Sequence, residues 1–259
     1  YGLFGYVSGF GVIKNVNIVS GSVTSTSGNG YLGALAGSLS GQAVVMNCSN
    51  SADVKDGRKN YTGGIVGTAV AGTKIYNCCN HGKIAGAWHT GGIVGYNGSD
   101  ITNCYNTGDV SSSYVNTSGS TSTEVRVGGV LGTPSAASRI ERCYNSGSVT
   151  SEGYNGGIAG QGQYGSYGNA AYSEFENCFY VKIDDMMGIG VDSSEREGIL
   201  SCSAEELKAL PEGLKQAFAV DLDNLNSGYP VLNWQIPDET GKNNYEEELE
   251  DLTIASLEV

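Results

Sequence analysis

The sequence predicts an all-β, single-stranded parallel β-helix, and three observations lead to this prediction. A Gly-Gly-apolar-apolar-Gly segment recurs at residues 63–67, 91–95, 128–132 and 156–160, with looser copies at 2–5 and 33–37. The last glycines of these segments lie 28 to 37 residues apart, a spacing typical of solenoids. Each glycine segment is followed by a short stretch of alternating residues, such as Asn103-Cys104-Tyr105-Asn106, as expected for an extended strand.

The strand and bend positions follow from this alternation. Cys104, Asn106 and Val110 share one face of a strand, whereas Ile101 is out of phase with them. A bend near Asn103 would restore the phase, and asparagine tolerates the left-handed backbone that such a bend needs. Glycines would form the corners between strands. Stacking of about six such coils over residues 1–180 would bury the apolar columns and align asparagines in hydrogen-bonded ladders, and the general preference of parallel connections favours a right-handed coil.

One column of the repeat contains a cysteine in nearly every coil. Because Val16 occupies the same place in the first coil, the column is interpreted as a small, buried, apolar position with free reduced thiols. A disulfide between adjacent coils is the alternative. A zinc site does not fit, since each coil supplies a single thiol and His81 and His89 are the only imidazoles. The column consists of Cys48, Cys78, Cys104, Cys143 and Cys178.

Two insertions depart from the regular period and are the predicted places for binding. Residues 111–127 and 161–174 are expected to form loops or an added hairpin. The second contains Tyr164, Tyr167 and Tyr172, whose rings could stack on a sugar or anchor a protein. Trp88 and His89, at a corner, are a weaker ligand-binding candidate. The simpler interpretation is that these side chains cover glycine-rich corners and turns.

The repeat stops near Val181, and residues 181–237 are predicted to form a cap. Ser203 and Glu206 have the spacing of a capping box and predict a helix ending near Leu210. Pro211 predicts the start of a second helix that continues through Ala219. Residues 229–234 predict a final strand. This helix-plus-strand unit is expected to plug the open end of the β-helix, and residues 238–259 form an acidic linker or the start of a next domain.

Composition excludes several functions. The net charge of −13 argues against binding to nucleic acid, and no apolar run reaches the 18 residues that a membrane span requires. No metal site, cofactor or catalytic constellation is predicted. Asp53, Lys83 and Asp109 share a column whose mixed charge indicates a solvent-facing position, not a calcium site. The first residue, Tyr1, falls inside a repeat, so we expect the chain to be part of a longer one.

The repeats resemble the GLUG motif of bacterial cell-surface proteins, in which Gly-apolar-apolar-Gly precedes Asn-Cys-Tyr-Asn-x-Gly-x-Val. Residues 91–110 match this pattern closely, and residues 63–84 and 128–149 also match. The pattern is broken at Val16 and at Arg142, which stand where the motif has cysteine and asparagine. The resemblance covers residues 1–236 and implies an extracellular or cell-surface location. It implies no catalytic residue.

The sequence is compatible with two functions. The first is a non-enzymatic surface module, a stalk or an adhesin that binds a host glycan or extracellular protein. The alternative is a polysaccharide lyase or hydrolase, since such enzymes also use β-helices. An enzyme of that kind needs carboxylates gathered on one exposed face, whereas the acids of this repeat region are scattered.

Overall fold

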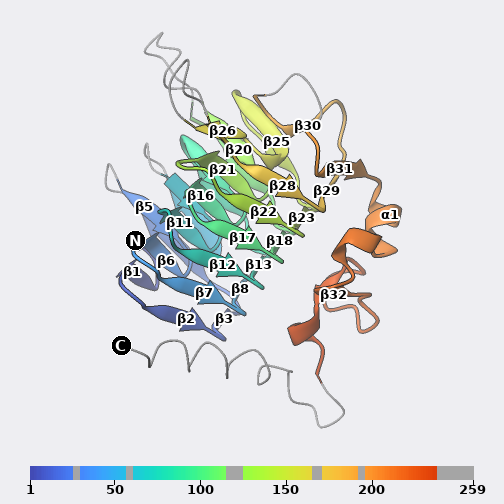
Figure 1. The fold of residues 1–259 in the computed structure, drawn as a ribbon, viewed down its shortest axis with the longest axis horizontal. Helices are drawn as coiled ribbons and strands as arrows, with labels where there is room; N and C mark the ends of the chain where they lie inside the picture. The colour runs from blue at the N-terminus through green and yellow to red at the C-terminus, as the bar shows by residue number, and fades with distance from the viewer. Residues whose placement is uncertain (26–29, 57–60, 115–124, 165–170, 192–195, 238–259) are drawn as a thin grey trace.

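The computed structural model describes residues 1–25, 30–56, 61–114, 125–164, 171–191 and 196–237, and in them the chain winds into a stack of parallel coils (Figure 1). Four sheets run along the stack; successive coils add one strand each to sheets B and C and one or two to sheet A, whereas sheet D takes one strand from each of the first five coils. The strands of neighbouring coils pair in parallel register within each sheet. The predicted parallel β-helix is therefore confirmed.

Two of the four sheets carry the glycine segments and the strand that precedes the bend. Sheet A follows the order β1 (Phe4–Val7), β6 (Ala36–Leu39), β11 (Val66–Ala69), β16 (Val94–Asn97), β21 (Leu131–Pro134), β25 (Tyr154–Ala159), β20 (Arg126–Gly128), β15 (His89–Gly91), β10 (Tyr61–Gly63) and β5 (Tyr31–Gly33), with β30 (Met187–Ile189) against β25. Sheet B follows the order β2 (Val12–Lys14), β7 (Val44–Met46), β12 (Lys74–Tyr76), β17 (Asp100–Thr102), β22 (Arg139–Glu141) and β28 (Glu174–Glu176).

The other two sheets carry the strands that follow the bend. Sheet C follows the order β3 (Asn17–Ile18), β8 (Ser49–Asn50), β13 (Cys79–Asn80), β18 (Tyr105–Asn106), β23 (Tyr144–Asn145), β29 (Cys178–Val181) and β31 (Ile199–Cys202). Sheet D follows the order β24 (Val149–Thr150), β19 (Val110–Ser112), β14 (Ile84–Gly86), β9 (Asp53–Asp56) and β4 (Ser22–Ser25).

The cysteine column lies in the interior, as predicted. All five thiols are fully buried among isoleucine, leucine and valine side chains, and each cysteine is free. The Cys104 thiol donates to the carbonyl oxygens of Thr102 and Ile75 at 3.2 and 3.8 Å. Burial raises the pKa of Cys104 well above its usual value, so the thiol stays protonated and behaves as a small apolar group.

The bend before each buried cysteine has a left-handed backbone. In the coil of Cys104 the bend residue is Asn103, with φ 52°, and Asn47 and Asn77 adopt the same conformation. Arg142 also takes it, with φ 48°, and its guanidinium donates to Asn103 Oδ1 at 2.8 Å. The predicted bend is thus confirmed, and Arg142 continues a polar column that is otherwise made of asparagine side chains.

A second asparagine column forms a buried ladder between the coils. Asn50 donates to Asn80 at 2.8 Å, Asn80 to Asn106 at 2.7 Å, and Asn106 to Asn145 at 2.7 Å, always from the amide nitrogen to the next side-chain oxygen. All four side chains are fully buried. Because a buried amide without partners would cost about 1–3 kcal/mol, the ladder fixes the register of one coil on the next.

Corners and the charged column agree with their predicted roles. A side chain on Gly92 would collide with the Gly129 carbonyl of the next coil, so the corner requires glycine. Directly before the sheet D strands β14 and β19, the Lys83 ammonium lies 3.8 Å from the Asp109 carboxylate, and their side chains are 73% and 53% exposed. The pair is therefore a surface contact in a solvent-facing column.

One of the two insertions contains an added hairpin. Strands β26 (Gln163–Tyr164) and β27 (Ala171–Tyr172) pair in antiparallel register between β25 and β28. The tip of this insertion, residues 165–170, and most of the other one, residues 115–124, lie outside the described part of the chain.

Coil-like pairing continues beyond Val181. Strand β30 pairs with β25 in sheet A, and β31 pairs with β29 in sheet C over Ile199–Cys202. These two strands extend the stack by an incomplete coil at its C-terminal end. They leave the rest of the C-terminal region free to pack elsewhere.

Residues 203–237, here called the cap, follow this incomplete coil. Helix α1 (Ala204–Lys208) begins at Ser203 with both hydrogen bonds of the predicted capping box. The predicted second helix is wrong: a short 3₁₀ helix, η2 (Glu212–Leu214), gives way to strand β32 (Phe218–Ala219). Strand β32 pairs with β33 (Val231–Leu232), which is followed by the 3₁₀ helix η3 (Asn233–Gln235). No helix in the described ranges is long and apolar enough to cross a membrane.

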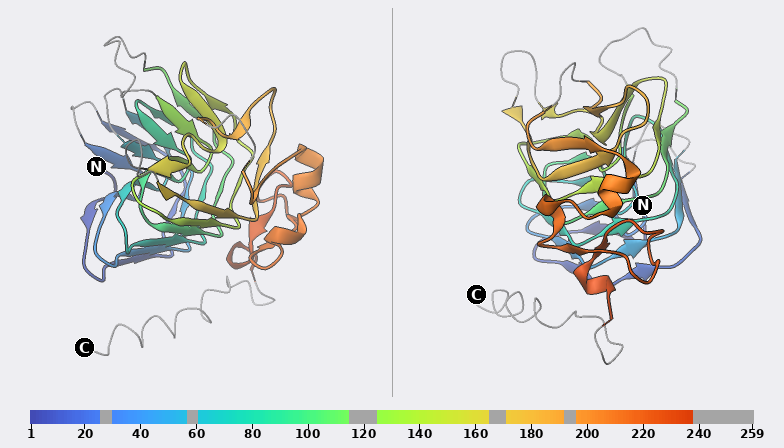
Figure 2. Two further views of the ribbon diagram at one scale, coloured as in Figure 1. Left: turned by 45° about the horizontal axis from the view of Figure 1, so that its top comes forward. Right: turned by 90° about the vertical axis from the view of Figure 1, so that its right-hand side faces the viewer.

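The cap does not plug the end of the β-helix, and this expectation is corrected. It lies along the side of the stack, against the outer face of sheet C (Figures 1 and 2). Its final part reaches back over earlier coils, where the Trp234 indole nitrogen donates to the Asn77 carbonyl oxygen at 2.9 Å. The end of the stack is instead extended by β30 and β31.

The outward column of sheet C explains this lateral position. Tyr105 and Tyr144 point away from the interior, as alternation predicts, yet both are fully buried. Their rings stack at 4.9 Å, and Phe218 of the cap packs against both. Burying a Phe-sized side chain contributes about 1.5–3 kcal/mol, so the cap binds where the outer face of the sheet is aromatic. Leu207, Leu214 and Leu232 complete this second core.

Candidate functional site

A polar cleft of about 660 Å³ lies between the cap and the outer face of sheet C. One wall comes from the strands and turns of successive coils and the other from the cap. The coil wall consists of Asn17, Ser49, Ser51, His81, Thr107 and Ser146. The cap wall consists of Leu225, Asn226, Ser227, Tyr229, Trp234 and Gln235. The volume falls within the range of small-molecule sites.

The cleft exists because the outward-facing column of sheet C changes along the stack from small polar side chains to tyrosines. In register, Ser49 and Asn17 occupy the places that Tyr105 and Tyr144 occupy in later coils. The tyrosine rings fill the space beneath the cap, whereas the small polar side chains leave it open. The cap therefore overhangs the earlier coils and encloses a polar space beside the apolar second core.

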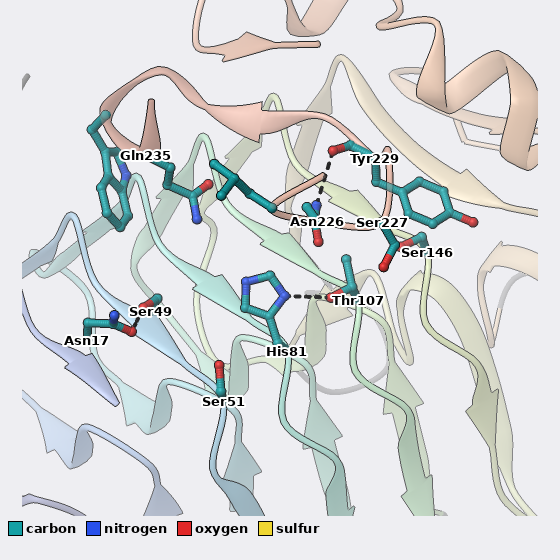
Figure 3. A pocket seen from close by; sticks show the side chains of 12 residues that line it. Asn17, Ser49, Ser51, His81, Thr107, Ser146, Asn226, Ser227, Tyr229 and Gln235 are labelled. Atoms are coloured by element: carbon teal, nitrogen blue, oxygen red, sulfur yellow. Dashed lines mark hydrogen bonds between the residues drawn. The ribbon is translucent and has the colours of Figure 1, made fainter. Parts of the chain in front are cut away.

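Turn residues that follow the asparagine ladder form the cleft's floor. Ser51, His81, Thr107 and Ser146 each come directly after a ladder asparagine, so the coil repeat aligns them. Figure 3 shows His81 in the middle of the cleft, with Gln235 of the cap above it.

A directional hydrogen-bond relay joins the floor to the cap. The Tyr105 hydroxyl donates to Gln235 Oε1 at 3.0 Å, so in the 3.3 Å contact between Tyr105 and His81 the proton belongs to His81 Nε2. His81 Nδ1 is then the acceptor from Thr107 Oγ1 at 2.8 Å. Gln235 Nε2 finally donates to Cys79 Sγ at 3.5 Å. The relay fixes the orientation of the imidazole and of the Gln235 amide.

The cleft is uncharged. None of the residues that line it is Asp, Glu, Lys or Arg. Burial lowers the pKa of His81 below its usual value, which keeps the imidazole neutral at pH 7. The Lys208 ammonium is not among the lining groups and lies over the Tyr229 ring, 4.7 Å from its centroid. Among the described residues no group of three or more His, Cys, Asp or Glu could hold a metal ion.

The structure places the sequence-predicted ligand residues elsewhere. Trp88 and His89 lie at the corner that leads into sheet A, on a different sheet from the cleft. Tyr164 and Tyr172 belong to the β26–β27 hairpin, and Tyr167 lies outside the described residues. The structure therefore does not bring the predicted candidates together in the cleft, and their binding role stays a prediction.

Trp88 and His89 belong to an outer aromatic cluster on sheet A. Tyr61 stacks on Tyr31 at 5.6 Å and on Tyr96 at 4.4 Å, and the His89 ring lies 5.1 Å from that of Tyr61. The tyrosine rings thus cover each other's faces along the stack axis. Such packing is what we expect if the aromatic side chains only cover the outside of their own coils, which is the simpler interpretation given above.

His89 makes stability sensitive to acid. Burial, and then the charge of Arg126, lower its pKa from 6.5 to about 3 in the folded protein. Between these values the unfolded chain binds the extra proton, so stability falls as pH drops below about 6.5. From pH 7 to 5 this loss amounts to at most about 2 kcal/mol. His89→Gln, measured by urea unfolding at both pH values, should remove this part of the pH dependence.

Tyr96→Phe provides the control for this experiment, because it keeps the imidazole and the ring stack. It should lose as much stability between pH 7 and 5 as the unmodified protein. An equal loss in His89→Gln would contradict the assignment of this pH dependence to His89.

Sequence reasoning missed the cleft residues. The column Ser51, His81, Thr107 and Ser146 was visible as a polar position beside the ladder, but polar turn residues are ordinary in any solenoid. The sequence predicts a final strand over residues 229–234, which includes Trp234, in a cap at the end of the stack, and it predicts no role for Gln235. The missing information was the lateral docking of the cap, which places Gln235 against Tyr105, a residue 130 positions earlier in the chain.

The stacked coils, the shared interior columns and the lateral cap define the chain as a parallel β-helix repeat protein. Residues 86–111 match the family described as the GLUG motif. The matched segment runs from the end of β14 into β19 and therefore covers most of one coil. The predicted resemblance to GLUG-motif repeats is confirmed.

Comparison with solved structures agrees with the fold. The crystal structure of a "putative immunoglobulin A1 protease" from Bacteroides ovatus is similar, with a TM-score of 0.58 and 23% sequence identity. The similarity covers 89% of this chain and 74% of that one. At this identity the likeness shows the β-helix fold alone. No curated protein matches the sequence significantly.

Proposed function

We propose that this chain is a non-enzymatic β-helix module of a bacterial cell-surface or secreted protein. It presents the cleft beneath the cap to a host glycan or an extracellular protein. The GLUG repeat supports the surface setting. The observation that carries the binding role is the cleft itself, a concave polar space whose central side chains are held by the His81–Gln235 relay. Such preorganisation lowers the entropic cost of binding.

The distribution of acids favours binding over glycoside cleavage. Hydrolysis requires two carboxylates beside the scissile bond, and no carboxylate lines the cleft. Glu141 and Glu176 form an acid pair in register on neighbouring coils of sheet B. Both are bound to arginines, Glu141 to Arg142 and Glu176 to Arg139. These contacts explain the pair as a structural ion-pair network.

A binding experiment with a blocked cleft tests the proposal. The purified chain should bind in a glycan array or in a pull-down of host extracellular proteins. Ser51→Trp, which places a large side chain in the cleft, should abolish that binding. Lys55→Trp introduces the same side chain on the exposed face of sheet D and should leave binding intact. Blank results in both assays would contradict a binding role and leave a stalk, and equal binding by the two variants would place the ligand outside the cleft.

A further inference from the structure

The chemistry of the cleft narrows the class of ligand. An anionic ligand would meet no lining cation in a protein with a net charge of −13. A cationic ligand would meet no lining carboxylate. Burial of an unpaired charge is costly, so the cleft suits an uncharged ligand.

Several hydroxyls that line the cleft have hydrogen-bonding capacity left over. The relay uses the Thr107 proton, which leaves the lone pairs of Thr107 Oγ1 as acceptors. The hydroxyls of Ser51, Ser146 and Ser227 make no side-chain hydrogen bond to any residue that the structure describes. A hydroxyl both donates and accepts, and it best matches a ligand that carries several hydroxyls of its own. An apolar ligand would leave these groups unpaired.

Trp234 supplies a flat apolar wall. Its hydrogen bond to Asn77 holds the indole in place, and the ring is half-buried at the cleft. Trp234 lies on the cap wall of the cleft beside Gln235. Its indole is an aromatic surface suited to the C–H face of a ring-shaped ligand.

We infer that the cleft binds an uncharged pyranose unit of a glycan, with the sugar face on Trp234 and its hydroxyls on the Thr107 and serine oxygens. This assignment rests on the proposed function, because it names the ligand class of the same cleft. Recognition of a neutral sugar requires no metal and no charged group, in agreement with the lining.

A glycan array with matched pairs tests this inference. Each neutral oligosaccharide is printed beside its sialylated or sulfated counterpart. The neutral oligosaccharide that binds most strongly is then added stepwise to the protein while its tryptophan fluorescence is recorded. We expect the acidic counterpart to bind at least about tenfold more weakly when the added group lies on the bound sugar. The chain has two tryptophans, Trp88 and Trp234. The fluorescence change should be lost in Trp234→Phe and kept in Trp88→Phe.

The outcomes separate the inference from the proposed function. Preferential binding of acidic glycans or of a protein, blocked by Ser51→Trp, would overturn the sugar assignment and keep the cleft as the binding site. Two results would overturn the assignment of the site. One is binding of neutral glycans that Ser51→Trp leaves unchanged, and the other is a fluorescence change that is lost in Trp88→Phe and kept in Trp234→Phe. If neither the glycan array nor the pull-down of host proteins finds a ligand, the proposed function is overturned as well. Because Trp234→Phe could loosen the cap, Ser51→Trp serves as the second variant.

Discussion

Cys104→Asp is expected to prevent stable folding of the coil stack. The thiol is fully buried, and it donates to two carbonyl oxygens, those of Thr102 and Ile75. A carboxylate accepts hydrogen bonds and cannot donate them, so it would face acceptors in an apolar interior. The loss of stability should exceed about 4 kcal/mol, because an unpaired buried charge belongs to the most damaging class of substitution.

The control for this substitution is supplied by the sequence itself. Val16 occupies the cysteine position in the first coil, so Cys104→Val replaces the thiol with a side chain that this column already accepts. It should change stability by less than about 1.5 kcal/mol. Urea unfolding monitored by circular dichroism would compare the two variants. Near-normal stability of Cys104→Asp would show that the thiol position is not the dry interior described above.

The interior of the stack was predictable because each element of it repeats. The buried cysteine column and the left-handed bend at Asn103 both follow from alternation and from the backbone preference of asparagine. A repeat provides several independent copies of the same local signal, so the register of one coil predicts that of the next. Even Arg142, which breaks the motif, adopts the bend conformation because its neighbours above and below impose it.

The cap and the cleft were not predictable in the same way, because they occur once. The alternation of residues correctly predicts that Tyr105 and Tyr144 point out of the interior. No local sequence signal indicates that Phe218 packs on both of them. The contact between Trp234 and Asn77 joins residues 157 positions apart. Such a pairing depends on the shape of the finished stack, which no periodic signal in residues 203–237 encodes. The cleft is a consequence of that docking.

Tyr144→Ala should release the cap and leave the coils folded. The Tyr144 ring is fully buried between Tyr105 and Phe218, at 4.9 and 5.5 Å. Its hydroxyl donates to the Pro230 carbonyl oxygen and accepts from Asn226 at 2.7 Å. Truncation of a buried aromatic ring costs about 3–5 kcal/mol, and the loss falls on the contact between cap and sheet C. Both cap partners would also lose a buried hydrogen bond.

Hydrogen exchange measures where this loss occurs. Amides of residues 203–237 should exchange much faster in Tyr144→Ala, whereas those of sheets A and B should keep most of their protection, because the coils stack without the cap. Tyr144→Phe keeps the ring and loses only the hydroxyl bonds, so it should cost about 1–2 kcal/mol and leave the cap docked. Faster exchange throughout the coils with an unchanged cap would show that Tyr144 stabilises the stack itself. Because the cap forms one wall of the cleft, its release in Tyr144→Ala should also abolish ligand binding there, whereas Tyr144→Phe should retain it.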